Sequence, residues 1–99
     1  MAGRKPVISR DRAVELAQEA LIWLSCDPDR IGPFLALSGI APDELRARAG
    51  DPEFLAAVLD HLLGSDAWVE AFAAEHRISP HRPAEARAAL PGGDAPAWT

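Results

Sequence analysis

Residues 51–64, DPEFLAAVLDHLLG, decide the fold of this 99-residue chain. Asp51 is a good N-cap residue, and Pro52 suits the first helical position, where a missing N–H costs nothing. Gly64 stands where a helix commonly ends on a left-handed residue. The apolar residues between these signals recur at helical spacing and occupy about half of the circumference: Phe54, Leu55, Val58, Leu59, Leu62 and Leu63. An ordinary surface helix has a narrower apolar stripe. We therefore predict a central helix over 51–63 that neighbours cover on more than one side.

The composition limits the fold to one all-α domain. A chain of 99 residues is too short to give each of two domains a usable core. It contains no Tyr, few β-branched residues and no run in which apolar and polar residues alternate, so strands are not expected. We predict a single compact bundle of five to six short helices over residues 9–91. A flexible leader at 1–8 and a disordered tail at 92–99 would flank it.

Capping signals place the other helices. Ser9 can cap a first helix that runs to about residue 25. A third helix is predicted over 42–49, where acidic residues come first and arginines last, in the order that favours the helix dipole. Another helix is predicted over 67–76. A last, weaker helix follows, and Pro83 compromises it.

The segment after the first helix is predicted to be interrupted. Gly32 and Pro33 oppose one long helix, because Pro33 lies six positions in, where a proline removes one backbone hydrogen bond and clashes with the preceding turn. We expect a short helix or 3-10 turn near 28–31. A brief helix over 33–38 would follow and end at Gly39.

The order of these segments resembles a known family. The combined string of FLALSGI (34–40) with PDELRARAGDPEFLAAVLD (42–60), followed by ARAALPGG (86–93), carries the resemblance, which covers residues 10–93. The chain resembles the domain-of-unknown-function family numbered 3572. The resemblance implies an all-helical bundle from a bacterial cytoplasm, and it supplies no catalytic residue. The prolines inside the predicted second and last helices depart from the family's pattern, where a helix former is expected.

Charge disfavours a nucleic-acid partner. The net charge is −5, and residues 1–12 carry +3, so the remainder carries −8. A body that acidic repels a phosphate backbone. The pair of helices at 42–49 and 51–63 is arranged like a helix-turn-helix, but a recognition helix needs exposed basic or amide side chains. The second helix instead presents Glu53, Ala57, Asp60 and His61.

Targeting signals and cysteine usage favour a cytoplasmic location. The basic residues at 1–12 are not followed by an apolar signal segment, and no stretch of the chain approaches a membrane span. We interpret the basic N-terminus as a solvated leader, with contact to an acidic surface as the alternative. Cys26 is the single cysteine, so no internal disulfide can form.

The residues that most often carry chemistry do not combine into a site. Asp60 and His61 are adjacent on a helix and diverge by about 100°, so we interpret them as a surface acid and a boundary histidine. His76 is expected to bond a carbonyl at its helix end. His76 and His81 lack the i, i+4 spacing of paired metal ligands, and no third ligand is evident. Cys26 is interpreted as a packing residue. We therefore predict no enzyme activity, no cofactor and no metal.

One candidate contact remains at Ile22 and Trp23, on a flank of the first helix where solvent is expected. Ile22 shares its arc with Asp11, Glu15 and Gln18. Such residues are either covered by the leader or last helix, or they mark a partner contact. We predict that the protein acts through contacts with a protein partner or a second copy. A small enzyme and a nucleic-acid-binding helix-turn-helix module are the disfavoured alternatives.

Overall fold

The structure, a computed structural model, describes residues 8–91 and is all-α over that range. No strand occurs in the described part, which confirms the predicted fold class. Of the predicted leader only Ile8 is described, and it is buried at 8% exposure, so it belongs to the core and not to a flexible leader. The predicted tail lies outside the described residues. The elements are α1 (Arg10–Ser25), α2 (Pro28–Ser38), the 3-10 turn η1 (Pro42–Glu44), α3 (Leu45–Arg48), α4 (Pro52–Leu63), α5 (Asp66–His76) and α6 (Arg82–Ala88).

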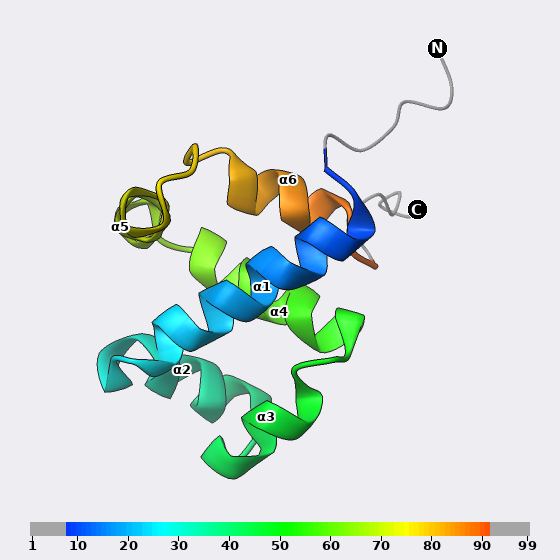
Figure 1. Cartoon of the computed structure of the whole chain (residues 1–99). Coiled ribbons are helices and arrows are strands. Elements are labelled where there is room, and N and C mark those ends of the chain that lie inside the picture. Colours follow the sequence, from blue (N-terminus) through cyan, green and yellow to red (C-terminus); the bar gives the residue numbers. More distant parts are fainter. Residues whose placement is uncertain (1–7, 92–99) are drawn as a thin grey trace, which may run out of the picture.

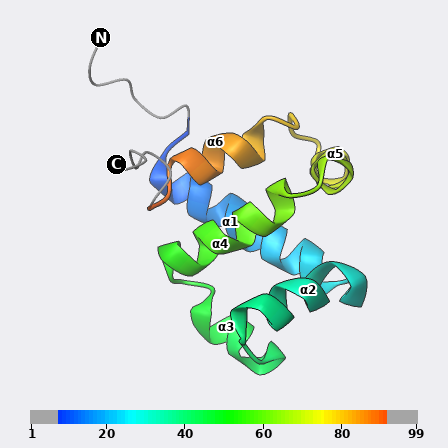
Figure 2. The same cartoon turned by 180° about the vertical axis from the view of Figure 1, so that it is seen from behind.

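Helix α4 is central, as the apolar spacing predicts. It packs against α1, α5 and α6, and in Figures 1 and 2 α1 and α4 cross as two layers between α6 on one side and α2 with α3 on the other. The Asp51 carboxylate accepts the Glu53 N–H at 3.0 Å and caps the helix. The buried residues of α4 lie on more than one side of it: Phe54, Leu55, Ala56, Val58, Leu59 and Leu62.

The end of α4 differs from the prediction. Gly64 has a φ of −70° and is right-handed, not left-handed. The reason is the short connection: the chain turns at once into the N-cap Ser65, whose Oγ accepts the Trp68 N–H at 3.2 Å. The left-handed helix ends are Gly39, with a φ of 71°, and Arg77, with a φ of 57°.

Helix α2 is continuous, which corrects the predicted interruption near Pro33. Asp27 caps it by accepting the Asp29 N–H at 2.9 Å, and it ends at Gly39 as predicted. A proline normally forces the preceding residue out of the helical region, through contacts that include that residue's Cβ. Gly32 has no Cβ, so it can stay helical before Pro33 and the helix loses only one backbone bond.

The third and last helices are shorter than the sequence predicts. The segment at 42–49 divides into η1 and α3, and its first turn is closed by the Ala41 N–H donating to Glu44 Oε1 at 2.8 Å. Helix α6 begins at Arg82, which makes Pro83 part of its first turn. A proline there has no intrahelical bond to lose, so Pro83 fits the first turn of the helix instead of compromising it. Its ring is buried in the core.

Candidate functional site

Ile22 and Trp23 lie on different sides of α1. Adjacent helical residues point about 100° apart, and the two exposures differ accordingly: the Ile22 side chain is 65% exposed and Trp23 only 5%. Solvent exposure is therefore confirmed for Ile22, which neither the last helix nor Ile8 covers. The same prediction is wrong for Trp23, whose side chain points into the core. The two residues form no joint contact.

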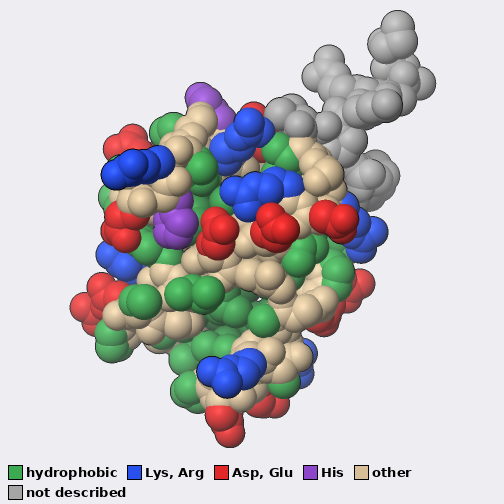
Figure 3. Space-filling model, viewed as in Figure 1, with side chains coloured by type: hydrophobic (Ala, Val, Ile, Leu, Met, Phe, Trp, Pro, Cys, Tyr) green, Lys and Arg blue, Asp and Glu red, His purple; other side chains and the backbone are tan. Residues whose placement is uncertain are grey.

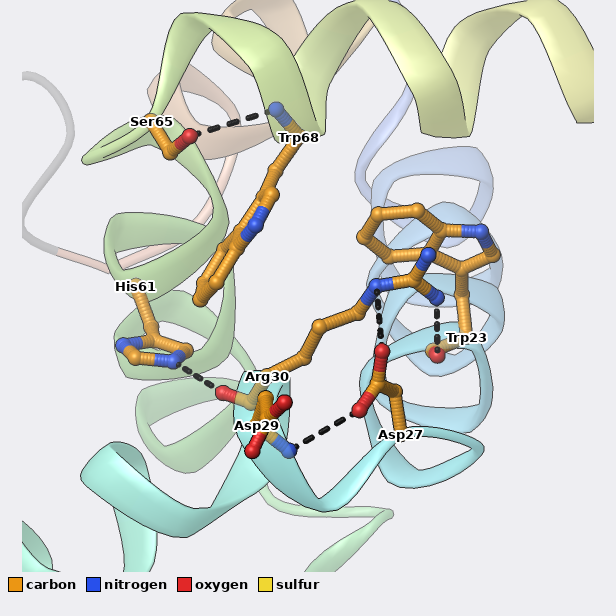
Figure 4. A network of polar contacts seen from close by, with 7 residues as sticks. All are labelled: Trp23, Asp27, Asp29, Arg30, His61, Ser65 and Trp68. Atoms are coloured by element: carbon orange, nitrogen blue, oxygen red, sulfur yellow. Dashed lines mark hydrogen bonds and ion pairs between the residues drawn. The ribbon is translucent and has the colours of Figure 1, made fainter.

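Trp23 is enclosed by residues of α2 and α5. Its indole packs edge to face against Phe72, with ring centroids 5.8 Å apart. The Arg30 guanidinium lies 3.6 Å above the indole and donates to the Trp23 carbonyl at 3.4 Å. The Asp27 carboxylate forms an ion pair with the guanidinium, with Oδ2 3.7 Å from Arg30 Nε (Figure 4). The Trp23 indole N–H has no hydrogen-bond partner within residues 8–91. Trp23 is thus a core residue whose indole face is shielded by the Arg30 guanidinium.

His61 extends this contact network to α4 and α5. Its Nε2 lies 2.7 Å from the Arg30 carbonyl oxygen, so Nε2 carries the hydrogen and donates it. The ring packs against Trp68, with centroids 5.3 Å apart (Figure 4). Asp60 points elsewhere and pairs with Arg87 of α6 at 2.7 Å. The predicted roles of a surface acid and a boundary histidine are confirmed, because Asp60 is exposed and His61 is half-buried.

Ile22 stands at the lip of a groove between α1 and the η1–α3 segment, which we call the α1–α3 groove. The groove has a volume of about 870 Å³. Figure 3 shows hydrophobic side chains gathered between α1, in the middle of the view, and α3, at the bottom. Its apolar lining comes from both sides: Leu21, Ile22 and Cys26 on one, and Pro42, Leu45 and Ala49 on the other.

Polar groups frame the α1–α3 groove. The Gln18 amide donates to the Ala49 carbonyl at 2.7 Å and fixes the end of α3 against α1. Asp43 and Arg46 line the groove, and both are exposed. Cys26, predicted to pack, is instead exposed there, at the C-cap position that follows α1. The groove therefore combines an apolar lining with one acidic and one basic side chain.

The remaining histidines lie apart from this groove. His76 Nδ1 donates to the Phe72 carbonyl at 3.0 Å, which confirms its predicted role at the end of α5. His81 is exposed before α6. Within residues 8–91, no three His, Cys, Asp or Glu side chains are close enough to hold a metal ion.

Adding zinc to the purified protein should therefore leave its melting temperature unchanged, since metal binding would stabilise the folded state only at a site with ligands in place. Thermal unfolding followed by circular dichroism with and without zinc measures this. Tight, stoichiometric zinc binding in a calorimeter would contradict the prediction and bring His76 and His81 forward as ligands.

The sequence does not predict the α1–α3 groove, although it singles out one of the residues that line it, Ile22. Ile22 stood out as an apolar residue among polar ones, whereas Pro42, Leu45 and Ala49 carry no signal of their own in the sequence. They line the groove because the chain reverses between α2 and α4. The Gln18–Ala49 hydrogen bond, between residues 31 positions apart, has no local sequence signature.

Comparisons with known proteins place the chain in a family. No curated protein and no solved structure matches it significantly. In the part that the structure describes, no helix has both the length and the apolar character needed to cross a membrane. The model of the family described as "Protein of unknown function (DUF3572)" matches residues 10–93, in agreement with the resemblance carried by the 34–60 segment. This chain therefore belongs to the DUF3572 family.

Proposed function

We propose that this protein acts through protein–protein contacts, with the α1–α3 groove as its contact surface. The exposure of Ile22 at the lip of this groove carries the proposal. Ile22 and Leu37 are the two large hydrophobic side chains that the described residues expose. Leu37 lies at a shallower hollow of about 440 Å³ between α2 and α4. The larger groove has apolar residues on both of its walls, as surfaces that receive apolar side chains of another protein do.

The charges of the molecule favour a protein over a nucleic acid as the partner. The exposed residues of α4 include Glu53 and Asp60, so the helix that would enter a DNA groove presents acidic side chains. Arg46 and Arg48 of α3 are exposed, but Asp43 and Glu44 precede them in the same segment. A cytoplasmic location forms part of the proposal: the single cysteine, Cys26, is an exposed free thiol, which a reducing compartment preserves.

The change Ile22→Glu should abolish association while leaving the fold intact. A carboxylate at the lip of the groove would have to lose its water when a partner covers it. In the free protein it stays solvated, so the free energy of unfolding should change by no more than about 0.5 kcal/mol. Urea unfolding measures the stability. Affinity purification of tagged protein from native lysate, with the purified protein analysed in parallel by sedimentation velocity, measures association.

Leu37→Glu is the matched control, because it places the same charge on the other exposed hydrophobic residue. The proposal is supported when a partner or an oligomer is present with wild type and with Leu37→Glu, and absent with Ile22→Glu. Equal association by all three proteins would contradict it. A clear loss of stability in Ile22→Glu with association intact would also contradict it, and would make Ile22 a core residue.

A further inference from the structure

We propose that the occupant of the α1–α3 groove is the same groove of a second copy of this chain, which gives a two-fold symmetric dimer. This inference rests on the proposed function and names its partner. A two-fold interface pairs one surface patch with itself, so the patch must carry both halves of every contact. The shape and the charges of the groove each meet this requirement.

The apolar part of the groove offers both a projecting side chain and a place to receive one. Ile22 projects from the lip. Leu21 also lines the groove but is buried, so it forms the floor, and Leu45 is half-buried on the opposite wall. Under a two-fold axis, Ile22 of each copy enters the space between Leu21 and Leu45 of the other. Each copy then removes its exposed isoleucine from water.

The charged part of the groove is also self-complementary. Asp43 and Arg46 lie three positions apart in the η1–α3 segment, and both are exposed. Neither forms an ion pair with any residue between 8 and 91. A uniformly basic partner would be repelled by Arg46, and a uniformly acidic partner would be repelled by Asp43. A second copy turned by 180° sets Asp43 of each chain against Arg46 of the other, so both charges find a partner.

The two ion pairs would set the register of the dimer more than its strength. Pairs at a solvent-exposed rim contribute little affinity, whereas like charges brought together there oppose the complex. Dimerisation through one apolar groove of this size belongs with the weak, transient interfaces, so we expect the dimer to form only at high protein concentration.

Exchanging the charges tests the symmetry directly. Asp43→Arg gives a chain with two arginines in the groove, and Arg46→Asp gives one with two aspartates. Each variant alone should dimerise about tenfold more weakly than wild type, because two attractive contacts become repulsive. An equimolar mixture of the two should regain wild-type affinity, since every arginine then faces an aspartate. The double variant Asp43→Arg with Arg46→Asp should also regain it, because its reversed charges still match.

Sedimentation equilibrium of the purified full chain, from micromolar to millimolar concentration, measures these affinities. Ile22→Glu should be monomeric throughout, and Leu37→Glu should dimerise like wild type. The thermal melt of each variant shows that it is folded. A wild type that stays monomeric overturns the dimer. If Ile22→Glu has then also lost a lysate partner, the proposed contact function stands and only its occupant is wrong. A dimer whose single variants are not restored by mixing overturns the two-fold pairing of Asp43 with Arg46.

Discussion

Replacing Leu59 by alanine is expected to lower the free energy of unfolding by about 2–5 kcal/mol. Leu59 is fully buried, at 0% exposure, on the central helix. Its side chain lies in the cluster of buried residues that joins α4 to α1 and α6. Removing it takes apolar contacts away from several helices and leaves a cavity that the packed neighbours fill only in part. For a domain of this size the loss is a large share of the total stability.

The exposed Leu37 provides the control for this prediction. It is 88% exposed, so Leu37→Ala makes the same chemical change with little effect on burial. Its free energy of unfolding should stay within about 0.5 kcal/mol of wild type. Urea unfolding at 25 °C, followed by circular dichroism, gives both values, and an unchanged m-value shows that the two variants unfold from comparable states. Equal midpoints for Leu59→Ala and wild type would contradict the central position of α4.

The elements that the sequence predicts well carry their signals within one or two turns. The Asp51-Pro52 pair begins α4, and Ser9 begins α1 by accepting the Arg12 N–H at 3.1 Å. Such caps accept hydrogen bonds from backbone N–H groups two or three residues away, so their effect does not depend on tertiary contacts. The 34–60 segment, which carries the family resemblance, contains the Asp51-Pro52 pair. The family match covers this stretch.

The mispredictions at Pro33 and Pro83 share one cause, which is that a proline's effect depends on its position. Pro33 follows a glycine, and α2 passes through it. Pro83 falls in the first turn of α6, where a missing N–H has no consequence. Residue type alone predicts a helix breaker at both positions, whereas Gly32 before Pro33 and the start of α6 at Arg82 make both prolines compatible with a helix. The rule that a proline breaks a helix therefore fails where the preceding residue is glycine or where the proline lies in the first helical turn.

The candidate site was predictable only where one residue departed from its local pattern. Ile22 is apolar in a polar arc, and that anomaly marked it correctly as exposed. Trp23 has no such anomaly, because helical spacing places it seven residues after Leu16, on the apolar side of α1, and both side chains are buried. The opposite wall of the groove is set by how α3 docks on α1, through the Gln18–Ala49 hydrogen bond. Contacts between distant segments leave no periodic signal along the chain.

Trp23→Ala should lower the free energy of unfolding by about 3–5 kcal/mol, as for a buried aromatic residue truncated in a packed core. The indole makes the edge-to-face contact with Phe72, and it carries the Arg30 guanidinium on its face. Its loss removes both contacts and leaves a large cavity between α1, α2 and α5. The charged Arg30 would also lose the ring that it covers, an interaction that contributes about 0.5–2 kcal/mol in proteins.

Two control variants, Ile22→Ala and Trp23→Phe, test whether the loss of stability in Trp23→Ala comes from the burial of its side chain. Ile22→Ala alters the adjacent residue, which is exposed, so it should change stability by no more than about 0.5 kcal/mol. Trp23→Phe keeps an aromatic ring against Phe72 and removes the buried indole N–H, which has no partner among the described residues. An unpaired buried donor is itself destabilising, so this variant should lose clearly less than Trp23→Ala. Chemical unfolding of the three proteins in parallel measures the order. Similar losses for Ile22→Ala and Trp23→Ala would mean that α1 is rotated from the orientation that exposes Ile22, and the α1–α3 groove would then lose its lip.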